Sequence, residues 1–319
     1  MNPIWLEHYP PGVPTEVDIS RFASLKDLLE QSCARFRGRP AFTNLGVGLS
    51  YDELDRRSQA FGAWLQHEAG LQRGERVAIM LPNLLQYPVA LFGALRAGMV
   101  VVNVNPLYTA RELQHQLADS GATAIVVLEN FAHTLQEIIA TTALRHVITT
   151  RVGDLLPPPK ACLVNFVVKW IKRGVPRWQL PGAVAFNTVL RRGARHPLAA
   201  VAITQNDIAF LQYTGGTTGV AKGAILTHGN LVANVEQTSA WIGNILAEGE
   251  EVVITPLPLY HVFALTANLL TFVKWGGNNV LITNPRDIPG FIKVLRATRF
   301  SVITGVNTLY HKLLDAPGF

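Results

Sequence analysis

The sequence has only two cysteines among its 319 residues, and Cys33 and Cys162 lie far apart. This count excludes a disulfide framework and offers no spacing typical of a zinc site, so we expect a reducing, cytoplasmic location. Residues 1–14 lack the basic start and apolar core of a signal peptide. No apolar stretch approaches the roughly 20 residues that span a bilayer, so we do not expect an integral membrane protein.

Charged residues are also scarce, at 16% of the chain, and they form no long run of lysine and arginine. The net charge of +6 suits a nucleotide, an anionic lipid surface or a nucleic acid, and charge alone does not choose among them. Because no aromatic RNA-binding signature or zinc-finger spacing is present, we expect no nucleic-acid partner. In contrast, hydrophobic residues make up 49% of the chain, enough to build the cores of two packed subdomains.

Short apolar runs alternate with helical patterns along most of the chain. Capping boxes at Ser50–Glu53 and Thr109–Glu112 predict helix starts. Asn103 and Asn105, at the end of one apolar run, are predicted to organise a turn. The alternation is typical of βαβ units, so we predict the α/β class with mostly parallel sheets covered by helices on both faces. The predicted strands cover residues 76–81, 99–104, 122–128, 146–150, 208–213, 252–255, 280–283 and 302–304.

An irregular stretch over residues 155–200 is rich in proline, glycine and arginine and separates two blocks of this pattern. We therefore predict an N-terminal α/β subdomain over residues 1–200. A partial second α/β subdomain is predicted over residues 201–319.

Residues 161–173 within that stretch have the pattern of an interfacial helix. Their polar side chains fall on one narrow helical stripe, which leaves a wide apolar face with two aromatic residues. Basic and aromatic residues on a helix too short to span a bilayer predict peripheral membrane contact. Packing of the apolar face on the protein's own core is the alternative. The polar residues are Asn165, Lys169, Lys172 and Arg173.

The densest chemical signal is the segment Tyr213–Gly223, which follows a predicted strand. Its four glycines let backbone amides turn toward one point, and such a nest binds anions, most often phosphate. The Walker A pattern is not matched, because Lys222 follows Ala221. A plain turn is the alternative, although a turn requires neither a lysine nor so many hydroxyls. The predicted nucleotide-binding residues are Tyr213, Thr214, Gly215, Gly216, Thr217, Thr218, Gly219, Val220, Ala221, Lys222, Gly223 and Ala224.

This segment resembles the phosphate-binding loop of the adenylate-forming superfamily, the AMP-binding enzymes that include acyl-CoA synthetases and luciferases. Residues 82–88, 102–108, 256–263 and 282–287 are similar to segments of bacterial long-chain fatty acid–CoA ligases. The resemblance covers essentially the whole chain. It implies two stacked, mostly parallel sheets flanked by helices, with the second subdomain incomplete.

The resemblance also implies a reaction. In that family a carboxylate attacks the α-phosphate of ATP to give an acyl-adenylate and pyrophosphate, and coenzyme A then displaces AMP. We therefore expect ATP, Mg²⁺ and coenzyme A as cofactors and co-substrates, and a long-chain fatty acid as substrate. By motif match, residues 214–219 hold the β- and γ-phosphates, and Lys222 pairs with the leaving pyrophosphate.

An acyl site is implied in the same way. His261 would form its wall near the carboxylate and the adenylate, and Phe263 and Leu265 are similar to positions that line the acyl tunnel. Gly305 lies in a stretch similar to one beside that tunnel. From the residues alone, a structural histidine and ordinary core positions are the alternatives.

The family pattern continues beyond these 319 residues, so we expect this chain to lack the C-terminal domain and the segments that hold ribose, adenine and magnesium. No metal ligand is assigned among the residues present. Weak ATP affinity and negligible turnover are therefore expected of this chain alone. The alternatives are a non-catalytic acyl- or nucleotide-binding fragment and another acid–CoA ligase of the same superfamily. A homodimer and contact with the inner face of the cytoplasmic membrane are further expectations.

Overall fold

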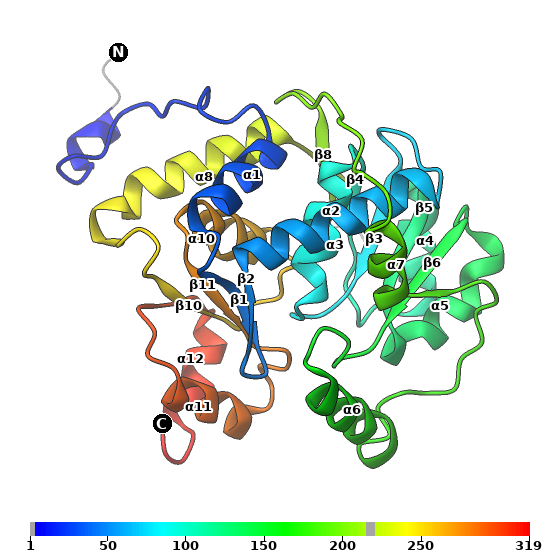
Figure 1. Cartoon of the computed structure of the whole chain (residues 1–319). Helices are drawn as coiled ribbons and strands as arrows, with labels where there is room; N and C mark the ends of the chain where they lie inside the picture. Colours follow the sequence, from blue (N-terminus) through cyan, green and yellow to red (C-terminus); the bar gives the residue numbers. More distant parts are fainter. Residues whose placement is uncertain (1–3, 215–220) are drawn as a thin grey trace.

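The structure is a computed structural model, and it describes residues 4–214 and 221–319. In this part of the chain the strands form two mostly parallel sheets that helices cover on both faces (Figure 1). The larger sheet has the strand order β7-β6-β5-β3-β4-β8-β9, and the smaller has the order β12-β10-β11-β1-β2. The predicted α/β class, with two mostly parallel sheets, is confirmed.

The larger sheet is built from the part of the chain between Arg76 and Thr227. Its strands pair in parallel, except that β9 runs antiparallel to β8. Most of its strands are continuous apolar runs, as expected where both faces are covered. The strands are β3 (Arg76–Met80), β4 (Val100–Asn103), β5 (Ala122–Leu128), β6 (His146–Thr150), β7 (Val184–Ala185), β8 (Ile208–Thr214) and β9 (Lys222–Thr227).

Successive side chains of a strand point to opposite faces of the sheet, and each face has its own helices. Val77 and Ile79 of β3 enter the main core with α2, α3 and α7, whereas Ala78 packs with α4 and α5. Both predicted capping boxes, at Ser50 and Thr109, are confirmed. These helices are α2 (Tyr51–His67), α3 (Gln86–Arg96), α4 (Ala110–Ser120), α5 (Ala132–Ile138) and α7 (Phe186–Gly193).

The smaller sheet joins segments that are distant in the sequence. β1 pairs in parallel with β11, so Phe42 lies opposite Asn279. One face of this sheet joins the main core, and α11 and α12 cover the other through side chains such as Phe291 and Leu313. Its elements are β1 (Pro40–Asn44), β2 (Val47–Ser50), β10 (Val252–Thr255), β11 (Asn278–Leu281), β12 (Val302–Ile303), α11 (Ile288–Ala297) and α12 (Asn307–Leu314).

The two sheets do not divide the chain at position 200. β8 and β9 follow that position and extend the sheet of the preceding segment, while β1 and β2 precede it and join the later strands. The sheets therefore depart from the predicted boundary. The reason is that cross-strand packing decides which strands pair, and closeness in sequence does not.

The stretch 155–200 is more regular than predicted. Pro158 and Pro159 stand in the first turn of α6, where a missing N–H is tolerated. A π-helical turn, η4, continues α6, and β7 and α7 follow. The bounds of the two elements not yet given are α6 (Pro158–Phe166) and η4 (Val167–Ile171).

The remaining helical elements cover the main core and the edges of the molecule. α9, η6 and α10 follow one another without a break. In the part of the chain that the structure describes, no helix is both long enough and apolar enough to cross a membrane. The elements are α1 (Leu25–Phe36), α8 (His228–Ile242), α9 (Val262–Ala264), the π-helical η6 (Leu265–Leu270), α10 (Thr271–Lys274) and the 3₁₀ turns η1 (Ile4–His8), η2 (Glu129–Phe131), η3 (Ile139–Thr141) and η5 (Gly243–Ile245).

Close packing and one buried ion-pair group join the helices of the main core. α7 meets α2 so closely that a Cβ on Gly193 would lie 1.9 Å from the carbonyl oxygen of Ala60. Arg96, at the end of α3, is buried and pairs with Glu30 of α1 at 3.1 Å and with Asp55 of α2 at 2.7 Å. Three helices are therefore tied together at one charged side chain.

Candidate active site

The predicted phosphate-binding segment connects β8 to β9 at one edge of the larger sheet. The two strands pair as far as Thr214 and Lys222. Of the predicted nucleotide-binding residues, Gly215, Gly216, Thr217, Thr218, Gly219 and Val220 lie outside the described residues. The structure describes the flanking residues Tyr213, Thr214, Ala221, Lys222, Gly223 and Ala224.

Tyr213 is buried and held by two neighbours. Its hydroxyl donates to Oδ2 of Asp119 on α4, at 2.5 Å. Its ring lies against Gly223, where an added Cβ would come within 3.0 Å of the ring atoms. Burial, followed by the hydrogen bond to Asp119, raises the pKa of Tyr213 well above its ordinary value. The phenol therefore stays protonated and remains a donor to the carboxylate.

Ala221, on the other side of the segment, is held from the same helix. Nε2 of His115 lies 2.9 Å from the carbonyl oxygen of Ala221. Because a carbonyl only accepts, the proton of this hydrogen bond is on Nε2. The neighbouring side chain, Lys222, is exposed, as is that of Thr214. The two stems of the segment, at Tyr213 and Ala221, thus both form hydrogen bonds to α4. The exposed Lys222 follows the second stem directly.

The two asparagines at the end of β4 differ in role. Asn105 forms the predicted turn, since its Oδ1 accepts the N–H of Leu107 at 3.0 Å. Asn103 does not, because its amide donates across the sheet to Oε1 of Gln212 at 3.0 Å. The turn prediction is wrong for Asn103, whose buried position at a strand end places it beside the next strand rather than in the loop.

Gln212 extends this contact to the loop that carries His261. Its Nε2 donates to the carbonyl oxygen of Tyr260 at 3.0 Å. The hydroxyl of Tyr87, on α3, lies 2.7 Å from Oδ1 of Asn103. We did not single out Gln212 from the sequence. The available signal was an amide side chain in an apolar strand, since buried amides require partners.

The same loop is anchored to the larger sheet by Asn83, which follows β3. The buried Asn83 amide donates to the carbonyl oxygens of Thr255 at 3.0 Å and Leu257 at 2.9 Å. Its Oδ1 accepts the N–H of Leu259 at 2.9 Å. The carboxyl ends of β3 and β10, one from each sheet, therefore meet here. In α/β proteins, ligand sites lie outside the carboxyl ends of the strands.

The predicted acyl-site residues differ in exposure. His261 is exposed, and its Nδ1 accepts the N–H of Phe263 at 3.4 Å at the start of α9. Phe263 is 47% exposed, so it is not part of the core. Leu265 is fully buried in the main core. The alternative assignment as core therefore describes Leu265 and does not describe Phe263.

Gly305 lies beside the same helical segment. The preceding residue, Thr304, donates its hydroxyl to Oδ1 of Asn268 in η6 at 3.0 Å. A Cβ on Gly305 would come within 2.7 Å of the Tyr310 ring. A hollow of about 930 Å³ between α11 and α12 is lined by none of the predicted site residues. The residue before Gly305 thus contacts η6, the helical segment that contains Leu265.

The described residues do not form a protein cage for a metal ion. Among residues 4–214 and 221–319 there is no cluster of three or more His, Cys, Asp and Glu side chains that could hold a metal. Magnesium takes many of its ligands from water and substrate phosphates, with one or two carboxylates. Mg²⁺ that is carried on the ATP phosphates would therefore need no such cluster, and we derive no step through the metal.

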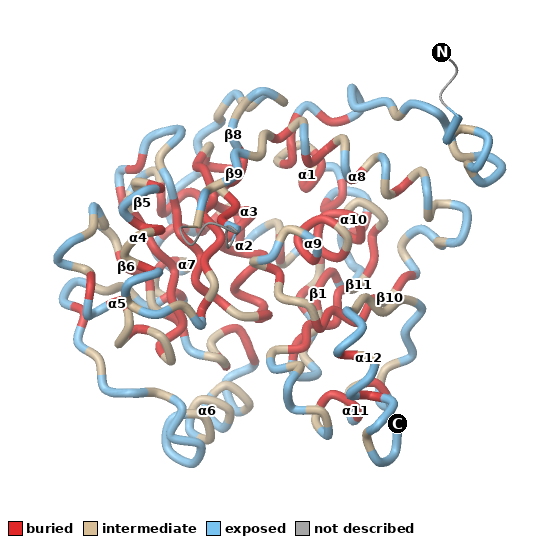
Figure 2. The backbone as a smooth tube through the Cα atoms, turned by 180° about the vertical axis from the view of Figure 1, so that it is seen from behind, coloured by how far each residue is buried: buried red, intermediate tan, exposed pale blue. Residues whose placement is uncertain are grey.

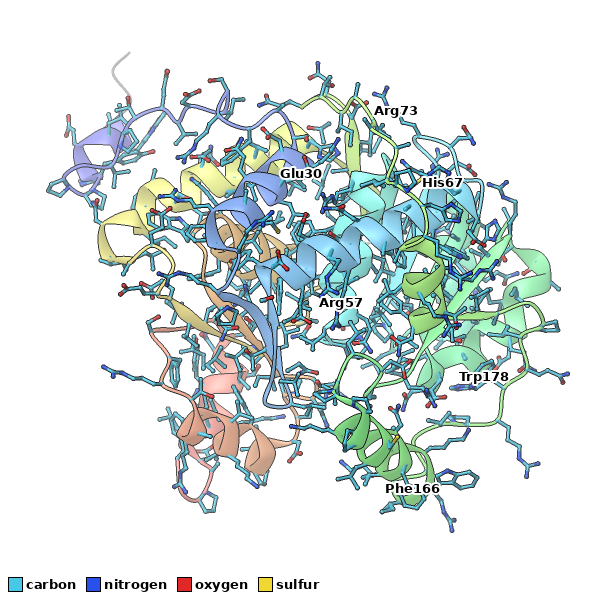
Figure 3. The ribbon with its side chains drawn as sticks, in the orientation of Figure 1. Glu30, Arg57, His67, Arg73, Phe166 and Trp178 are labelled. Carbon is cyan, nitrogen blue, oxygen red and sulfur yellow. The ribbon has the colours of Figure 1, made fainter. Side chains whose placement is uncertain are left out.

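The predicted interfacial helix turns its aromatic side chains outward, while Ala161 and Val164 pack against the main core. No residue of α6 or η4 is buried, and Phe166, Trp170 and Ile171 are at least 55% exposed. Asn165 turns inward, where its Oδ1 accepts the N–H of Gly153 at 2.8 Å. Figure 2 shows α6 in the colours of exposed and half-buried residues, and Figure 3 shows Phe166 pointing away from the sheets. The alternative of core packing therefore does not hold for the aromatic side chains.

Comparison with known proteins gives the family. The model of the AMP-binding enzyme family matches residues 29–319. A long-chain-fatty-acid–CoA ligase of Escherichia coli O157:H7 is 57% identical over 319 residues, which cover all of this chain and 57% of that protein. A protein of the same name from Haemophilus influenzae is 52% identical, again over all of this chain and 57% of its own length. The chain thus spans little more than half the length of these curated relatives.

Solved structures share the fold. An anthranilate CoA ligase bound to anthranoyl-AMP matches with a TM-score of 0.79 and 19% identity, over 95% of this chain and 54% of that one. A benzoate CoA ligase from Burkholderia xenovorans matches with a TM-score of 0.74 and 22% identity, over 92% of this chain and 52% of that one. From the family match over residues 29–319, the chain belongs to the AMP-binding enzymes.

Proposed function

We propose that the protein activates long-chain fatty acids with ATP and transfers them to coenzyme A. The identity of 52–57% to ligases of this name, over the whole of the present chain, supports the substrate class. The observation that carries the proposal is the β8–β9 hairpin, whose stems are anchored on α4 beside the exposed Lys222. A lysine next to a glycine- and threonine-rich connection suits a phosphate chain.

The proposed reaction has two steps. A carboxylate oxygen of the fatty acid attacks the α-phosphorus of ATP, the bond from that phosphorus to the bridging oxygen breaks, and pyrophosphate leaves. The coenzyme A thiol then loses its proton and attacks the acyl carbonyl, and AMP leaves with the electrons of the broken carbon–oxygen bond. In the first step the Lys222 ammonium neutralises charge that develops on pyrophosphate. Mg²⁺ carried on the ATP phosphates would supply further charge neutralisation.

The acyl chain is proposed to bind along α9 and η6. His261 would stand near the carboxylate, Phe263 would offer its exposed ring to the chain, and Leu265 would close the inner side. Gly305 would border the site from the end of β12. The support is the contact between Thr304 and η6, together with the anchoring of the His261 loop to both sheets.

ATP binding by the purified 319-residue chain is the first test. We expect binding that weakens at least about tenfold in Lys222→Ala, because a charge-assisted contact to phosphate is lost. Lys312→Ala removes an exposed lysine of α12 and should leave the ATP affinity unchanged. A folded chain that binds no ATP would contradict the proposal.

Pyrophosphate release then separates the proposed function from its alternatives. Release that depends on oleate would support adenylation by this chain. ATP binding without release would favour the second candidate, an acyl- or nucleotide-binding role without turnover. Palmitate should compete with oleate and benzoate should not. The opposite result would indicate a ligase for aromatic acids.

We also propose that α6 and η4 touch the inner face of the cytoplasmic membrane. Their outward aromatic and aliphatic side chains suit the boundary between headgroups and acyl chains. The surrounding charge suits an anionic surface, because residues 155–206 contain no aspartate or glutamate. The cationic residues of that stretch are Lys160, Lys169, Lys172, Arg173, Arg177, Arg191, Arg192 and Arg195.

Flotation with lipid vesicles tests this contact. We expect binding to vesicles that contain anionic phospholipid and weaker binding to neutral ones. Replacing Lys169, Lys172 and Arg173 with glutamate should abolish it. Replacing Arg56, Arg111 and Lys312 with glutamate makes the same change in net charge elsewhere and should preserve it. Equal binding by both triple variants would argue against the assigned surface.

A homodimer is the last proposal on partners. Exposed apolar side chains gather near the N-terminal turn and the end of α8, where Trp5, Trp241 and Ile245 are 61%, 49% and 82% exposed. The Tyr9 ring meets Trp241 edge-on at 5.1 Å, which joins the two elements. Light scattering should give a dimer for the unaltered chain and a monomer for Trp241→Ser. A monomer in both samples would contradict the proposal.

A further inference from the structure

α4 is a rigid support below the β8–β9 hairpin. Its N-terminus has a complete capping box, and its C-terminus ends at Gly121 in the left-handed conformation, with φ of 60°. Leu113 and Leu117 bury its inner face in the core between this helix and the larger sheet. A helix that is capped at both ends and buried along one side can hold other segments in place.

Two polar residues of α4 share the face that meets the hairpin. His115 and Asp119 are four residues apart, so they stand one above the other on the helix. Asp119 accepts a hydrogen bond from the hydroxyl of Tyr213, which precedes residues 215–220. His115 donates to the carbonyl oxygen of Ala221, which follows them. One helix face thus fixes both the point where the chain leaves β8 and the point where it returns to β9.

These two hydrogen bonds contribute more to the orientation of the segment than to the burial of apolar surface. Asp119 is exposed, so water would solvate its carboxylate if Tyr213 were absent. His115 is half-buried and reaches a backbone carbonyl that follows the predicted phosphate-binding residues. A hydrogen bond fixes both a distance and an angle, which apolar contact does not. Such constraints are useful where a phosphate chain must be aligned for reaction.

We propose that His115 and Asp119 are positioning residues of the nucleotide site, which hold the two stems of the phosphate-binding segment so that Lys222 meets the β- and γ-phosphates. The inference rests on the proposed function and extends it to residues that act through Tyr213 and Ala221. The two contacts join positions that are 94 and 106 residues apart in the chain.

Affinities for ATP and AMP, measured by calorimetry on the 319-residue chain, test the inference. Tyr213→Phe and Asp119→Ala should each lower ATP affinity about tenfold, because each removes the same charge-assisted hydrogen bond. AMP has no β- or γ-phosphate, so its affinity should change by less than about twofold. A merely structural role would lower both affinities by the same factor.

Further variants link each effect to its hydrogen bond. Tyr213→Phe combined with Asp119→Ala should lose no more ATP affinity than either change alone. His115→Ala should weaken ATP binding, and His115→Gln should restore most of it, because the glutamine amide can donate to Ala221. Gln114→Ala is the matched control, since it removes a hydrogen bond from the same helix to Thr141 and should change neither affinity.

The outcomes separate this inference from the proposed function. Selective loss of ATP affinity, with rescue by His115→Gln, supports the positioning role. Equal ratios of ATP to AMP affinity in all variants would overturn that role while the function stands, whatever happens to the melting temperature. No ATP binding by the unaltered chain would overturn both.

Discussion

The two sheets of this protein are assembled in opposite ways. The larger sheet takes its strands from residues 76–227, whereas the smaller combines residues 40–50 with residues 252–303. Closing the loop between the distant segments of the smaller sheet costs more conformational entropy than closing a βαβ unit. We therefore expect the smaller sheet to depend on the larger one and its helices, and the larger sheet to depend little on the smaller.

Both sheets contain buried polar side chains that form hydrogen bonds. β3 and β5 of the larger sheet are almost entirely apolar. In the smaller sheet, Thr255 donates to Asn279 at 3.1 Å and Asn268 donates to Thr255 at 3.2 Å, and all three are buried. Hydrogen bonds specify register where apolar contact does not. The larger sheet carries such a contact as well, between the buried Asn103 of β4 and Gln212 of β8.

The helical cover of the larger sheet provides the strongest test. Gly193→Ala places a methyl group 1.9 Å from the carbonyl oxygen of Ala60, so α2 and α7 must move apart. We expect the free energy of unfolding in urea to fall by at least about 3 kcal/mol, because the backbone cannot yield as a side chain can. If the smaller sheet depends on the larger one, amide protection should fall in both sheets.

Gly38→Ala is the control for this change. A Cβ at Gly38 would have no atom within 4 Å, so its unfolding free energy should stay within about 0.5 kcal/mol. Loss of protection confined to the larger sheet in Gly193→Ala would contradict the expected dependence.

The side chain of Asn83 forms hydrogen bonds that connect the two sheets. Its removal should lower the free energy of unfolding by less than Gly193→Ala does. Asn83→Ala leaves the carbonyl groups of the buried Thr255 and the half-buried Leu257, and the N–H of Leu259, without the partner that the amide supplied. We expect a loss of about 2–3 kcal/mol in unfolding free energy. Amide exchange, read by segment, should accelerate in β10 and β11 and stay slow in β3 and β5.

Asn187, whose side chain donates one hydrogen bond, is the control for this change. Asn187 is exposed and donates once, to the carbonyl oxygen of Asp154 at 2.8 Å, so Asn187→Ala should cost less than about 1 kcal/mol. Uniform acceleration of exchange across both sheets in Asn83→Ala would mean that the sheets open as one unit.

The sequence predicts most strands of both sheets but misses two of each, β7 and β9 in the larger sheet and β1 and β2 in the smaller one. The predicted bounds of β5, β6 and β10 coincide with the strands of the structure, because each is an apolar run with clear ends. β1 and β2 were not predicted, since these two short strands carry few apolar residues, of which Phe42 and Leu49 are the largest that are fully buried. Partners could not be assigned, because local propensity says nothing of which strand lies alongside.

The candidate site divides in the same way. Tyr213 to Ala224 could be located by composition and by resemblance, since the chemistry is concentrated in one segment. The support from α4 could not, because His115 and Asp119 have the appearance of ordinary polar residues on the outer face of an amphipathic helix. The direction of Phe166 was equally open, since an apolar helix face suits a core or a lipid surface.

Acid should weaken the contact between His228, which follows β9 of the larger sheet, and α1. We expect the resulting loss of unfolding free energy to be smaller than in Gly193→Ala and Asn83→Ala. His228 is buried after β9, and its Nδ1 accepts the N–H of Leu25 at 3.2 Å. Burial lowers the pKa of His228 from 6.5 to about 4. The unfolded chain binds this proton below about pH 6.5 and the folded chain only near pH 4, so the stability is present above pH 6.5 and is lost between these values.

Between pH 7 and pH 5 this proton should lower the free energy of unfolding by about 2 kcal/mol. Urea unfolding at the two values, compared with His228→Asn, measures it. The variant does not titrate, so its stability should fall less with acid, although it starts lower because the contact to Leu25 is changed. Amide exchange should accelerate first in α1, which packs against α8 and α10. The same dependence on pH in both proteins would assign the acid sensitivity to another group.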